Sequence, residues 1–322
     1  MKAIQQKDGQ LIWADQEDLI PGIGEILIAN RATAVNRADL MQRKGAYPPP
    51  PGASPIMGLE CAGEVIAVGE GVARYKAGDS VCALLSGGGY AEQVCVPAGQ
   101  ALPMPSGLSF EQAAALPEVY ATAYLNLFGE AQLQRTETVL LHAGASGVGT
   151  AAIQLCKAFG SDCYVTVGSD DKVSRCIELG AKGGCNRHSA KFVELVPQWT
   201  NQQGINVILD PVGGAYLADN VASLALEGRL VLIGLMGGLS ADLSLGLLLM
   251  KRLHIVGSTL RARTIAAKSR VMSNLEQQVW PKLESGEIKP MVDTVMPIQD
   301  IEKAHALIES DVTFGKVVLS IA

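Results

Sequence analysis

The sequence of 322 residues has no excess of basic side chains. It contains 26 Lys and Arg against 32 Asp and Glu, which gives a formal net charge of −6. A nucleic-acid backbone is neutralised by basic side chains, so we expect no polynucleotide partner. The sequence also has no CxxC pair. Its seven cysteines are an odd number and lie in apolar segments, which predicts reduced core thiols in a cytosolic type of compartment.

Signals for export and membrane insertion are absent as well. The first segment, MKAIQQKDGQLIW, has no apolar stretch of the signal-peptide type and begins like a strand. One long apolar segment, residues 229–252, is interrupted by Asp242, serines and glycines. This pattern favours a buried strand, a loop and a short helix over a membrane span. We therefore expect a cytoplasmic protein with no membrane partner.

The residues that are present indicate two domains. Hydrophobic residues make up 48% of the chain, and its length suits about two domains. Residues 1–117 contain Gly, Pro and short β-branched segments at close spacing, as in an antiparallel barrel. From residue 118 strands and helices alternate, which predicts a parallel, doubly wound α/β sheet. We expect a helix over 216–226, a strand over 229–236, a helical stretch at 264–284, and a tail of strand, helix and strand.

The most specific motif is VLLHAGASGVGTAAIQL, residues 139–155. A strand leads through Gly144, Gly147 and Gly149 into an amphipathic helix, and this spacing is a variant of the dinucleotide fingerprint. Glycines let the backbone approach a pyrophosphate, which then meets the partly positive N-terminus of the helix. The motif predicts a bound dinucleotide, and the alternative is a tight turn without a ligand.

The end of the next strand bears on which dinucleotide is bound. NAD sites usually place an acidic side chain there, on the ribose hydroxyls, whereas this sequence has Gly168 and Ser169, with Lys172 one turn later. Arg187, at the end of the following strand, is a second candidate for contact with an extra phosphate. Two aspartates directly after Ser169 oppose this interpretation, although they also suit the first turn of a helix. The alternative for both cations is solvated surface charge. The pattern favours NADP over NAD.

Residues 35–63, VNRADLMQRKGAYPPPPGASPIMGLECAG, form a stiff polar loop in an apolar chain. Four consecutive prolines and several polar side chains are typical of a loop that holds a ligand. No His or Cys precedes Cys61, so the loop lacks the ligands that zinc most often takes. We interpret Cys61 and the four histidines as structural or surface residues.

Over all 322 residues the chain resembles the medium-chain dehydrogenase/reductase superfamily. The segments NRADLMQRKGAYPPPPGA, GLECAGEV, HAGASGVGTAAIQL and LIGLMGG are similar to those of its zinc-free quinone oxidoreductases. They are most similar to the branch of the tumour-suppressor-inducible quinone oxidoreductase, and zeta-crystallin is a more distant relative. The resemblance implies a GroES-like β-barrel catalytic domain (1–117 and 265–322) and a Rossmann NADP-binding domain with a doubly wound parallel sheet (118–264).

The same resemblance implies a metal-free site. Zinc alcohol dehydrogenases carry Cys where this sequence has Asn36, and Gly-His-Glu where it has Gly58, Leu59 and Glu60. The lobe of four cysteines that binds their structural zinc has no counterpart around LLSGGGYAEQV. Catalytic zinc needs about three protein ligands and structural zinc four, so we expect no metal.

Site residues follow from the resemblance too. Asn36 would lie near the nicotinamide and Tyr47 beside the cofactor, as the catalytic candidates; the alternatives are a turn residue and a half-buried aromatic. Arg187 departs from zeta-crystallin, which has a His there. The implied cofactor-binding residues are Tyr47, Ser146, Gly147, Val148, Gly149, Gly168, Ser169, Lys172, Arg187, Gly213, Ile233, Gly234, Leu235, Met236, Thr259, Leu260 and Arg261.

The expected activity is NADPH-dependent reduction of a quinone or a similar conjugated carbonyl. The nicotinamide would supply a hydride, and the Tyr47 hydroxyl, the Asn36 amide or water would hydrogen-bond the developing oxyanion. One alternative is reduction of the C=C bond of enones or enals. Another is a low-turnover NADPH-binding protein that serves as a sensor or partner-binding module.

The last strands of the parallel sheet predict a homodimer. They are apolar and lack the Lys or Pro that usually protects an exposed edge, and zinc-free relatives typically pair their coenzyme domains across a two-fold axis. We expect the strand near residues 253–259 at or close to this interface. The alternative is a monomer in which a loop or the helical stretch at 264–284 covers the edge.

Overall fold

The computed structural model describes residues 1–321. The chain forms two compact units, here called unit 1 (Met1–Ala121 with Leu260–Ala322) and unit 2 (Thr122–Thr259). Each unit has its own sheet and its own buried apolar residues.

Unit 1 is built on a seven-stranded sheet, mostly antiparallel, in the order β14-β15-β3-β4-β5-β7, with β6 paired to β3. A separate hairpin, β1–β2, precedes it. The strand β15 comes from the end of the chain and pairs with β3, which brings the C-terminal segment beside the start of the chain. The strands are β1 Lys2–Lys7, β2 Gln10–Asp15, β3 Glu25–Ala34, β4 Glu60–Val68, β5 Ser80–Leu84, β6 Gln93–Pro97, β7 Ala101–Pro103, β14 Val292–Pro297 and β15 Lys316–Ser320. The helices are α1 Arg37–Arg43, α2 Phe110–Ala114, α3 Pro117–Tyr124, α9 Ile265–Gln278, α10 Trp280–Glu284 and α11 Ile301–Glu309.

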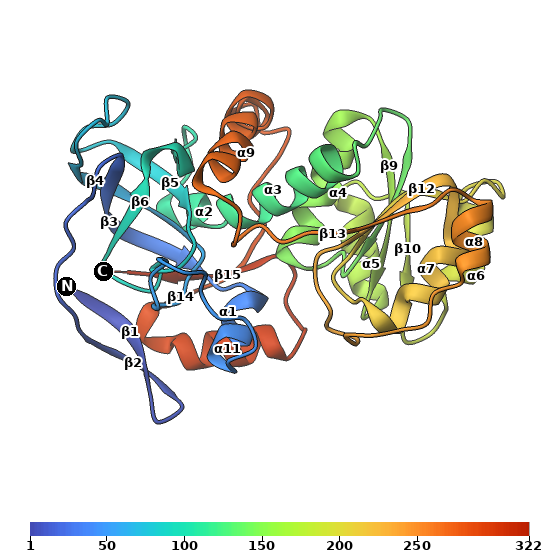
Figure 1. The fold of residues 1–322 in the computed structure, drawn as a ribbon, viewed down its shortest axis with the longest axis horizontal. Helices are drawn as coiled ribbons and strands as arrows, with labels where there is room; N and C mark the ends of the chain where they lie inside the picture. The colour runs from blue at the N-terminus through green and yellow to red at the C-terminus, as the bar shows by residue number, and fades with distance from the viewer. Residues whose placement is uncertain (322) are drawn as a thin grey trace. The chain divides into compact units, whose positions relative to one another are not determined.

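Unit 2 is a parallel six-stranded sheet in the order β10-β9-β8-β11-β12-β13. The chain runs outward from β8 in one direction and from β11 in the other, which confirms the doubly wound fold. The helices α4 and α5 lie on one side of the sheet, and α6, α7 and α8 lie on the other (Figure 1). The strands are β8 Thr138–His142, β9 Asp162–Val167, β10 Gly183–Asn186, β11 Ile205–Asp210, β12 Leu224–Leu232 and β13 His254–Gly257. The helices are α4 Gly147–Phe159, α5 Asp170–Leu179, α6 Phe192–Trp199, α7 Leu217–Ser223 and α8 Leu245–Met250.

The helix predicted over 216–226 is too long. The helix α7 ends at Ser223, and β12 begins at Leu224, where it pairs with Ile205 of β11. The residues Leu-Ala-Leu-Glu favour a helix locally, but pairing along β11 gives them a strand partner. Glu227 has a φ of +60°, and the register between the strands shifts here, as in a β-bulge.

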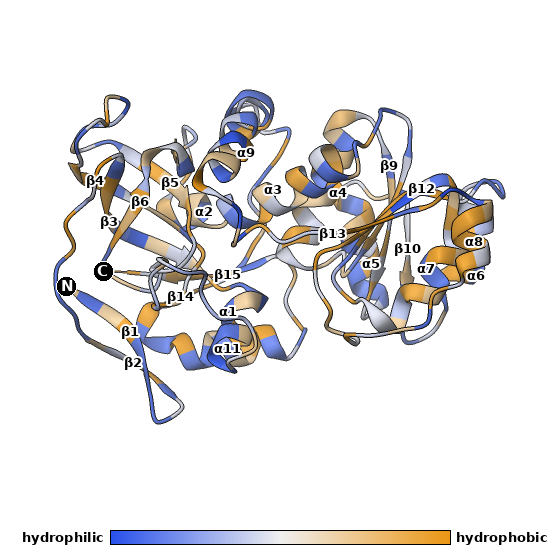
Figure 2. Cartoon of the chain, in the orientation of Figure 1, coloured by the Kyte–Doolittle hydropathy of each residue, from blue (hydrophilic) through white to orange (hydrophobic). Residues whose placement is uncertain are grey.

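The long apolar segment 229–252 contains the end of β12, a loop and the helix α8 in the predicted order, although the strand predicted over 229–236 ends at Leu232. Among residues 1–321, no helix combines the length and apolar character needed to cross a bilayer. The helix α8 is apolar around much of its surface (Figure 2), and Leu245, Leu249 and Met250 are 69%, 77% and 76% exposed. Unit 2 therefore presents an apolar helix to its surroundings.

Candidate functional site

Most of the predicted nucleotide-binding residues follow the strands of the parallel sheet of unit 2, in loops or in the first turn of the next helix, whereas Tyr47, Leu260 and Arg261 belong to unit 1. Because all six strands are parallel, their carboxyl ends share an edge, which is where open α/β sheets bind ligands. The structure brings these residues together there, after β8 to β13 in turn: Ser146, Gly147, Val148 and Gly149; Gly168 and Ser169; Arg187; Gly213; Ile233 to Met236; and Thr259.

The start of α4 is shaped to approach an anion closely. Ser146 caps the helix, and its side chain accepts a hydrogen bond from the Gly149 N–H at 3.0 Å. A Cβ atom on Gly149 would lie 2.5 Å from the carbonyl oxygens of Ala143 and Gly144, so only glycine fits the turn. The first helical N–H groups have no intrahelical acceptor and carry partial positive charge. This arrangement fits a phosphate group.

Residues at the ends of β9 and β10 form a second polar group. Ser169 caps α5 and accepts a hydrogen bond from the Lys172 N–H at 3.3 Å. The Arg187 guanidinium lies so close to Gly168 that a Cβ there would be 3.6 Å from one of its nitrogens. The Arg187 guanidinium and the Ser169 hydroxyl thus lie beside a position with no side chain, with Lys172 in the first turn of α5, which is a suitable environment for a phosphate monoester.

Two further loops meet beside the end of β11. The buried carboxylate of Asp210 accepts hydrogen bonds from the N–H groups of Val212 and Gly213 at 2.6 and 3.2 Å, and burial raises its pKa. Its carbonyl accepts the Ile233 N–H at 2.8 Å. The loop that contains Gly213 and the segment 233–236 therefore lie side by side.

His142 belongs to the scaffold of this edge. Its Nε2 lies 2.7 Å from Asn220 Oδ1, and its Nδ1 lies 2.9 Å from Thr166 Oγ1. The other side of the Asn220 amide donates to Asp210 at 2.9 Å. Burial lowers the His142 pKa to about 4. The neutral imidazole is hydrogen-bonded at both of its nitrogens and so orients the side chains of Thr166 and Asn220.

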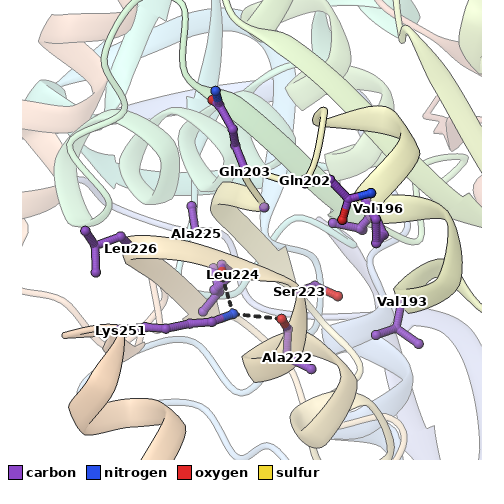
Figure 3. Close-up of a pocket in the computed structure, with 12 residues that line it drawn as sticks. Val193, Val196, Gln202, Gln203, Ala222, Ser223, Leu224, Ala225, Leu226 and Lys251 are labelled. Atoms are coloured by element: carbon purple, nitrogen blue, oxygen red, sulfur yellow. Dashed lines mark hydrogen bonds between the residues drawn. The ribbon is translucent and has the colours of Figure 1, made fainter.

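A cavity of about 300 Å³ lies elsewhere in unit 2 (Figure 3). None of the predicted site residues lines it. Its one charged group, the Lys251 ammonium, donates to the carbonyls of Ala222 and Leu224 at 2.8 and 2.6 Å, which caps the end of α7. We therefore assign this cavity no part in the site.

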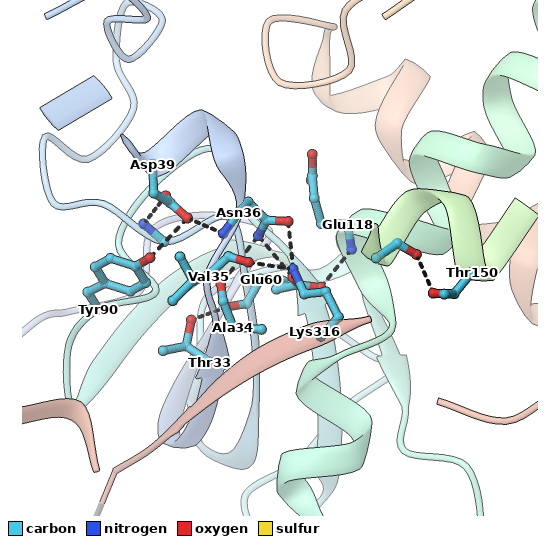
Figure 4. Close-up of polar contacts among 12 residues, drawn as sticks. Thr33, Ala34, Val35, Asn36, Asp39, Glu60, Tyr90, Glu118, Thr150 and Lys316 are labelled. Atoms are coloured by element: carbon cyan, nitrogen blue, oxygen red, sulfur yellow. Dashed lines mark hydrogen bonds and ion pairs between the residues drawn. The ribbon is translucent and has the colours of Figure 1, made fainter. Parts of the chain in front are cut away.

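In unit 1 the side-chain amide of Asn36 is held on both sides (Figure 4). Its Nδ2 donates to Glu60 Oε1 at 2.9 Å and to the Ala34 carbonyl at 3.3 Å. Its Oδ1 accepts from Lys316 Nζ at 2.7 Å. Both amide hydrogens are thus engaged within the protein, and the residue fixes the start of α1.

The partner of Asn36 is a buried ion pair. Lys316 Nζ lies 2.7 Å from Glu60 Oε1, and the two side chains are 4% and 0% exposed. The ammonium also donates to the Val35 carbonyl at 2.9 Å, so its three hydrogens have three acceptors. The second oxygen of Glu60 accepts the Glu118 N–H at 2.9 Å. Lys316 was not among the predicted site residues, although a lysine inside the apolar segment FGKVVLS is unusual.

A second buried carboxylate connects the loop to α1. Asp39 accepts hydrogen bonds from the backbone N–H groups of Asn36 and Gly58 at 2.8 and 3.0 Å. It also accepts from the Tyr90 hydroxyl at 3.0 Å. Burial raises the pKa of this carboxyl. The predicted polar loop 35–63 therefore contains the helix α1, and these contacts hold the start of α1 close to Gly58.

Tyr47 lies next to Arg261, which comes from the other segment of unit 1. The guanidinium is 5.4 Å from the centre of the tyrosine ring, within the range of a cation–π contact. Arg261 is only 3% exposed, and it donates to the Ser86 carbonyl at 2.8 Å and to Gln42 Oε1 at 2.7 Å. The Tyr47 hydroxyl forms no hydrogen bond with the described residues 1–321. Burial raises its pKa.

Glu118, in the first turn of α3, is a further residue that sequence analysis missed. Its backbone is tied to Glu60, but within the described residues 1–321 its carboxyl makes no hydrogen bond. Burial, followed by the charge of Glu60, raises the Glu118 pKa to about 8. No local sequence pattern indicated a role for Glu118, because the groups that surround it come from strands and helices distant in the sequence.

The donor groups of unit 1 do not fit a zinc ion. Both oxygens of Glu60 are taken by Asn36, Lys316 and the Glu118 N–H. Cys61 is fully buried, and burial raises its thiol pKa. Across residues 1–321, no group of three or more His, Cys, Asp or Glu side chains is placed to hold a metal. We therefore derive no zinc-dependent step.

Comparison with known proteins gives matches over both units. Residues 147–277 match the family described as zinc-binding dehydrogenase, and residues 22–106 match the alcohol dehydrogenase GroES-like domain. The synaptic vesicle membrane protein VAT-1 homolog of Rattus norvegicus is 32% identical over 314 residues, which covers 93% of this chain and 77% of that protein.

Two solved structures are similar over nearly the whole chain. The Escherichia coli quinone oxidoreductase complexed with NADPH is 30% identical, with a TM-score of 0.86, and 99% of each chain is covered. An NAD-dependent alcohol dehydrogenase is also 30% identical, with a TM-score of 0.87, and 100% of each chain is covered.

Proposed function

Since the chain belongs to the medium-chain dehydrogenase/reductase superfamily, we propose that it reduces quinones with NADPH and without a metal ion. The observation that carries this proposal is the full-length similarity to a quinone oxidoreductase that was solved with NADPH. The predicted position in the zinc-free branch agrees with a donor set that does not suit zinc. When bound, the nicotinamide would supply the hydride, and the protein would bind and orient both reactants.

For the cofactor, we propose that the N-terminus of α4 binds the pyrophosphate, with Ser146 to Gly149 in contact. Gly168, Ser169, Lys172 and Arg187 would surround the 2′-phosphate of NADPH. Gly213, the segment 233–236 and Thr259 would line the remainder of the nucleotide. The NAD-dependent alcohol dehydrogenase is similarly close in structure, so the two cofactors have to be compared directly.

For the substrate, we propose different roles for the two catalytic candidates. Tyr47 would donate its hydroxyl to the oxygen that becomes negative during hydride transfer. Asn36 would position α1 and the polar loop, because its amide hydrogens already bond to Glu60 and Ala34. A quinone becomes aromatic on reduction and needs less polarisation than a ketone, which suits a site without a metal.

The test is to follow NADPH oxidation with a panel of quinones and, in parallel, with an alkenal. We expect turnover with at least one quinone at a rate far above that in buffer. Preferential turnover of the alkenal would replace the proposal with C=C reduction. Tight NADPH binding without turnover of any acceptor would favour the sensor or partner-binding alternative.

We also propose a homodimer in a reducing, cytoplasmic compartment. The strand β13 stands at the edge of the sheet, and its Ile255 and Val256 offer apolar side chains for pairing with a second copy. All seven cysteines are free thiols, which suits a reducing compartment. The net charge of −6 continues to argue against a nucleic-acid partner.

A further inference from the structure

Glu118 is half-buried, and it differs from the fully buried charged groups of unit 1 because its carboxyl makes no hydrogen bond within the described residues 1–321. Lys316 has three acceptors, and Asp39 has three donors. Arg261 donates to three oxygens. A partly buried carboxylate without a hydrogen-bond donor is costly, so the Glu118 carboxyl gains from carrying a proton.

The position of Glu118 is nevertheless well defined. Its N–H donates to Glu60 Oε2 at 2.9 Å, which ties it to the ion pair that also holds Asn36. In Figure 4 its side chain points away from Glu60 and Lys316. The residue as a whole is half-buried and not sealed from solvent, so a proton that leaves the carboxyl can be replaced from water.

The charges around Glu118 come from several elements of unit 1. The carboxylates of Glu60 and Asp39 raise its pKa, and Lys316 and Arg261 lower it. Burial is the largest cause, and the resulting pKa is about 8. The charge of Glu118 in turn acts on the catalytic candidate Tyr47 and on Lys268. At neutral pH Glu118 therefore holds a proton, and its charge is felt at Tyr47, the proposed substrate residue.

We propose that Glu118 is the proton donor of the proposed reduction. The inference rests on the proposed function, in which the acceptor gains a hydride and the nicotinamide is oxidised. The oxygen left with negative charge then forms an O–H bond with the Glu118 proton, whose bond to the carboxyl breaks. One hydride and one proton convert the quinone to the hydroquinone, and water returns a proton to the carboxylate.

The activity test compares wild type with Glu118→Gln, which keeps the shape but has no acidic proton. General acids contribute about 10²- to 10⁴-fold, so we expect kcat to fall by roughly a hundredfold or more. Wild-type kcat should decline above about pH 8, and the variant should lack this decline. The matched control is Glu111→Gln in the first turn of the neighbouring helix α2, which should leave kcat and its pH profile unchanged.

A stability measurement gives a readout that needs no turnover. The folded pKa of Glu118, about 8, lies above its ordinary value of 4.5. In this window the unfolded chain loses the proton while the folded protein keeps it, so this group destabilises the fold as pH rises from about 4.5 to 8. The melting temperature of Glu118→Gln should therefore rise relative to wild type across this range and level off above it.

The outcomes separate the two proposals. If wild type is active, and if Glu118→Gln has the same kcat and the same fall of kcat above about pH 8, the donor role is wrong and the proposed function stands. A constant melting-temperature difference from pH 5 to 9 would likewise overturn the donor role, because Glu118 would then hold no proton at neutral pH. If wild type reduces no quinone, the proposed function is wrong and the donor role is lost with it.

Discussion

Replacing Lys316 with methionine should destabilise the protein more than any loss of a surface ion pair. The ammonium lies 2.7 Å from Glu60 Oε1, and both side chains are almost completely buried. Methionine has a similar length but no charge and no donor. The substitution therefore leaves the Glu60 carboxylate buried without its counter-ion, and it leaves Asn36 Oδ1 and the Val35 carbonyl without the donor they share.

The magnitude follows from this geometry. Removing one partner of a buried ion pair costs about 3–5 kcal/mol, mostly because the remaining charge is uncompensated. One kcal/mol lowers the melting temperature of a domain of 150–250 residues by about 2–4 °C, so we expect a decrease of roughly 6–20 °C. If Glu60 is changed to glutamine in the same chain, the uncompensated charge disappears, and the double variant should recover about 1–3 kcal/mol.

Thermal and urea denaturation of the four proteins in this double-mutant cycle would measure the effect. The matched control is Lys303→Met, which removes an exposed ion pair with Asp300 whose lysine is 74% exposed. It should change the free energy of unfolding by less than about 1 kcal/mol. The reasoning is refuted if Lys316→Met is no more destabilising than this control, or if the double variant is less stable than Lys316→Met alone.

Three further predictions concern unit 2. Replacing Lys172 or Arg187 with alanine should weaken NADPH by about tenfold to a hundredfold, the value of one charge-assisted hydrogen bond, and NADH far less; equal losses in a thermal-shift titration would contradict the NADP assignment. Gly149→Ala should abolish stabilisation by either cofactor, because its Cβ would lie 2.5 Å from two carbonyl oxygens; an unchanged thermal shift would remove the phosphate role of this turn. Val256→Asp should dissociate the dimer, as measured by light scattering, and a dimer indifferent to it would place the interface elsewhere.

The fold of unit 2 was predictable because its signals are local. The turn around Gly149 identifies a strand and a helix within one short segment, and both occur where expected. The helix α6 was not predicted, because Pro197 near its end is typical of a helix break. The boundary at Leu224 was missed for the opposite reason, since its residues favour a helix and only the pairing with β11 makes them a strand.

The site in unit 1 was less predictable because its partners are far apart in the sequence. Asn36 was singled out from the polar loop, but its hydrogen-bond acceptor and donor lie on β4 and β15. Only the pairing of β15 with β3 and of β3 with β4 places Lys316 beside Glu60. A sequence shows that a lysine lies in an apolar strand, but it does not show which carboxylate compensates the charge.

The two glutamates joined by one hydrogen bond show how a single cluster can separate a structural role from a chemical one. Glu60 is surrounded by donors and paired with Lys316, so moving a proton onto it would disrupt contacts that hold α1 and α3. Glu118 is held in place by the hydrogen bond from its backbone N–H to Glu60. Its own carboxyl makes no hydrogen bond or ion pair within the described residues 1–321. Environments that treat two carboxyl groups differently are how proteins assign acid and base roles to one residue type. The proposed proton transfer at Glu118 would therefore leave the ion pair between Glu60 and Lys316 intact.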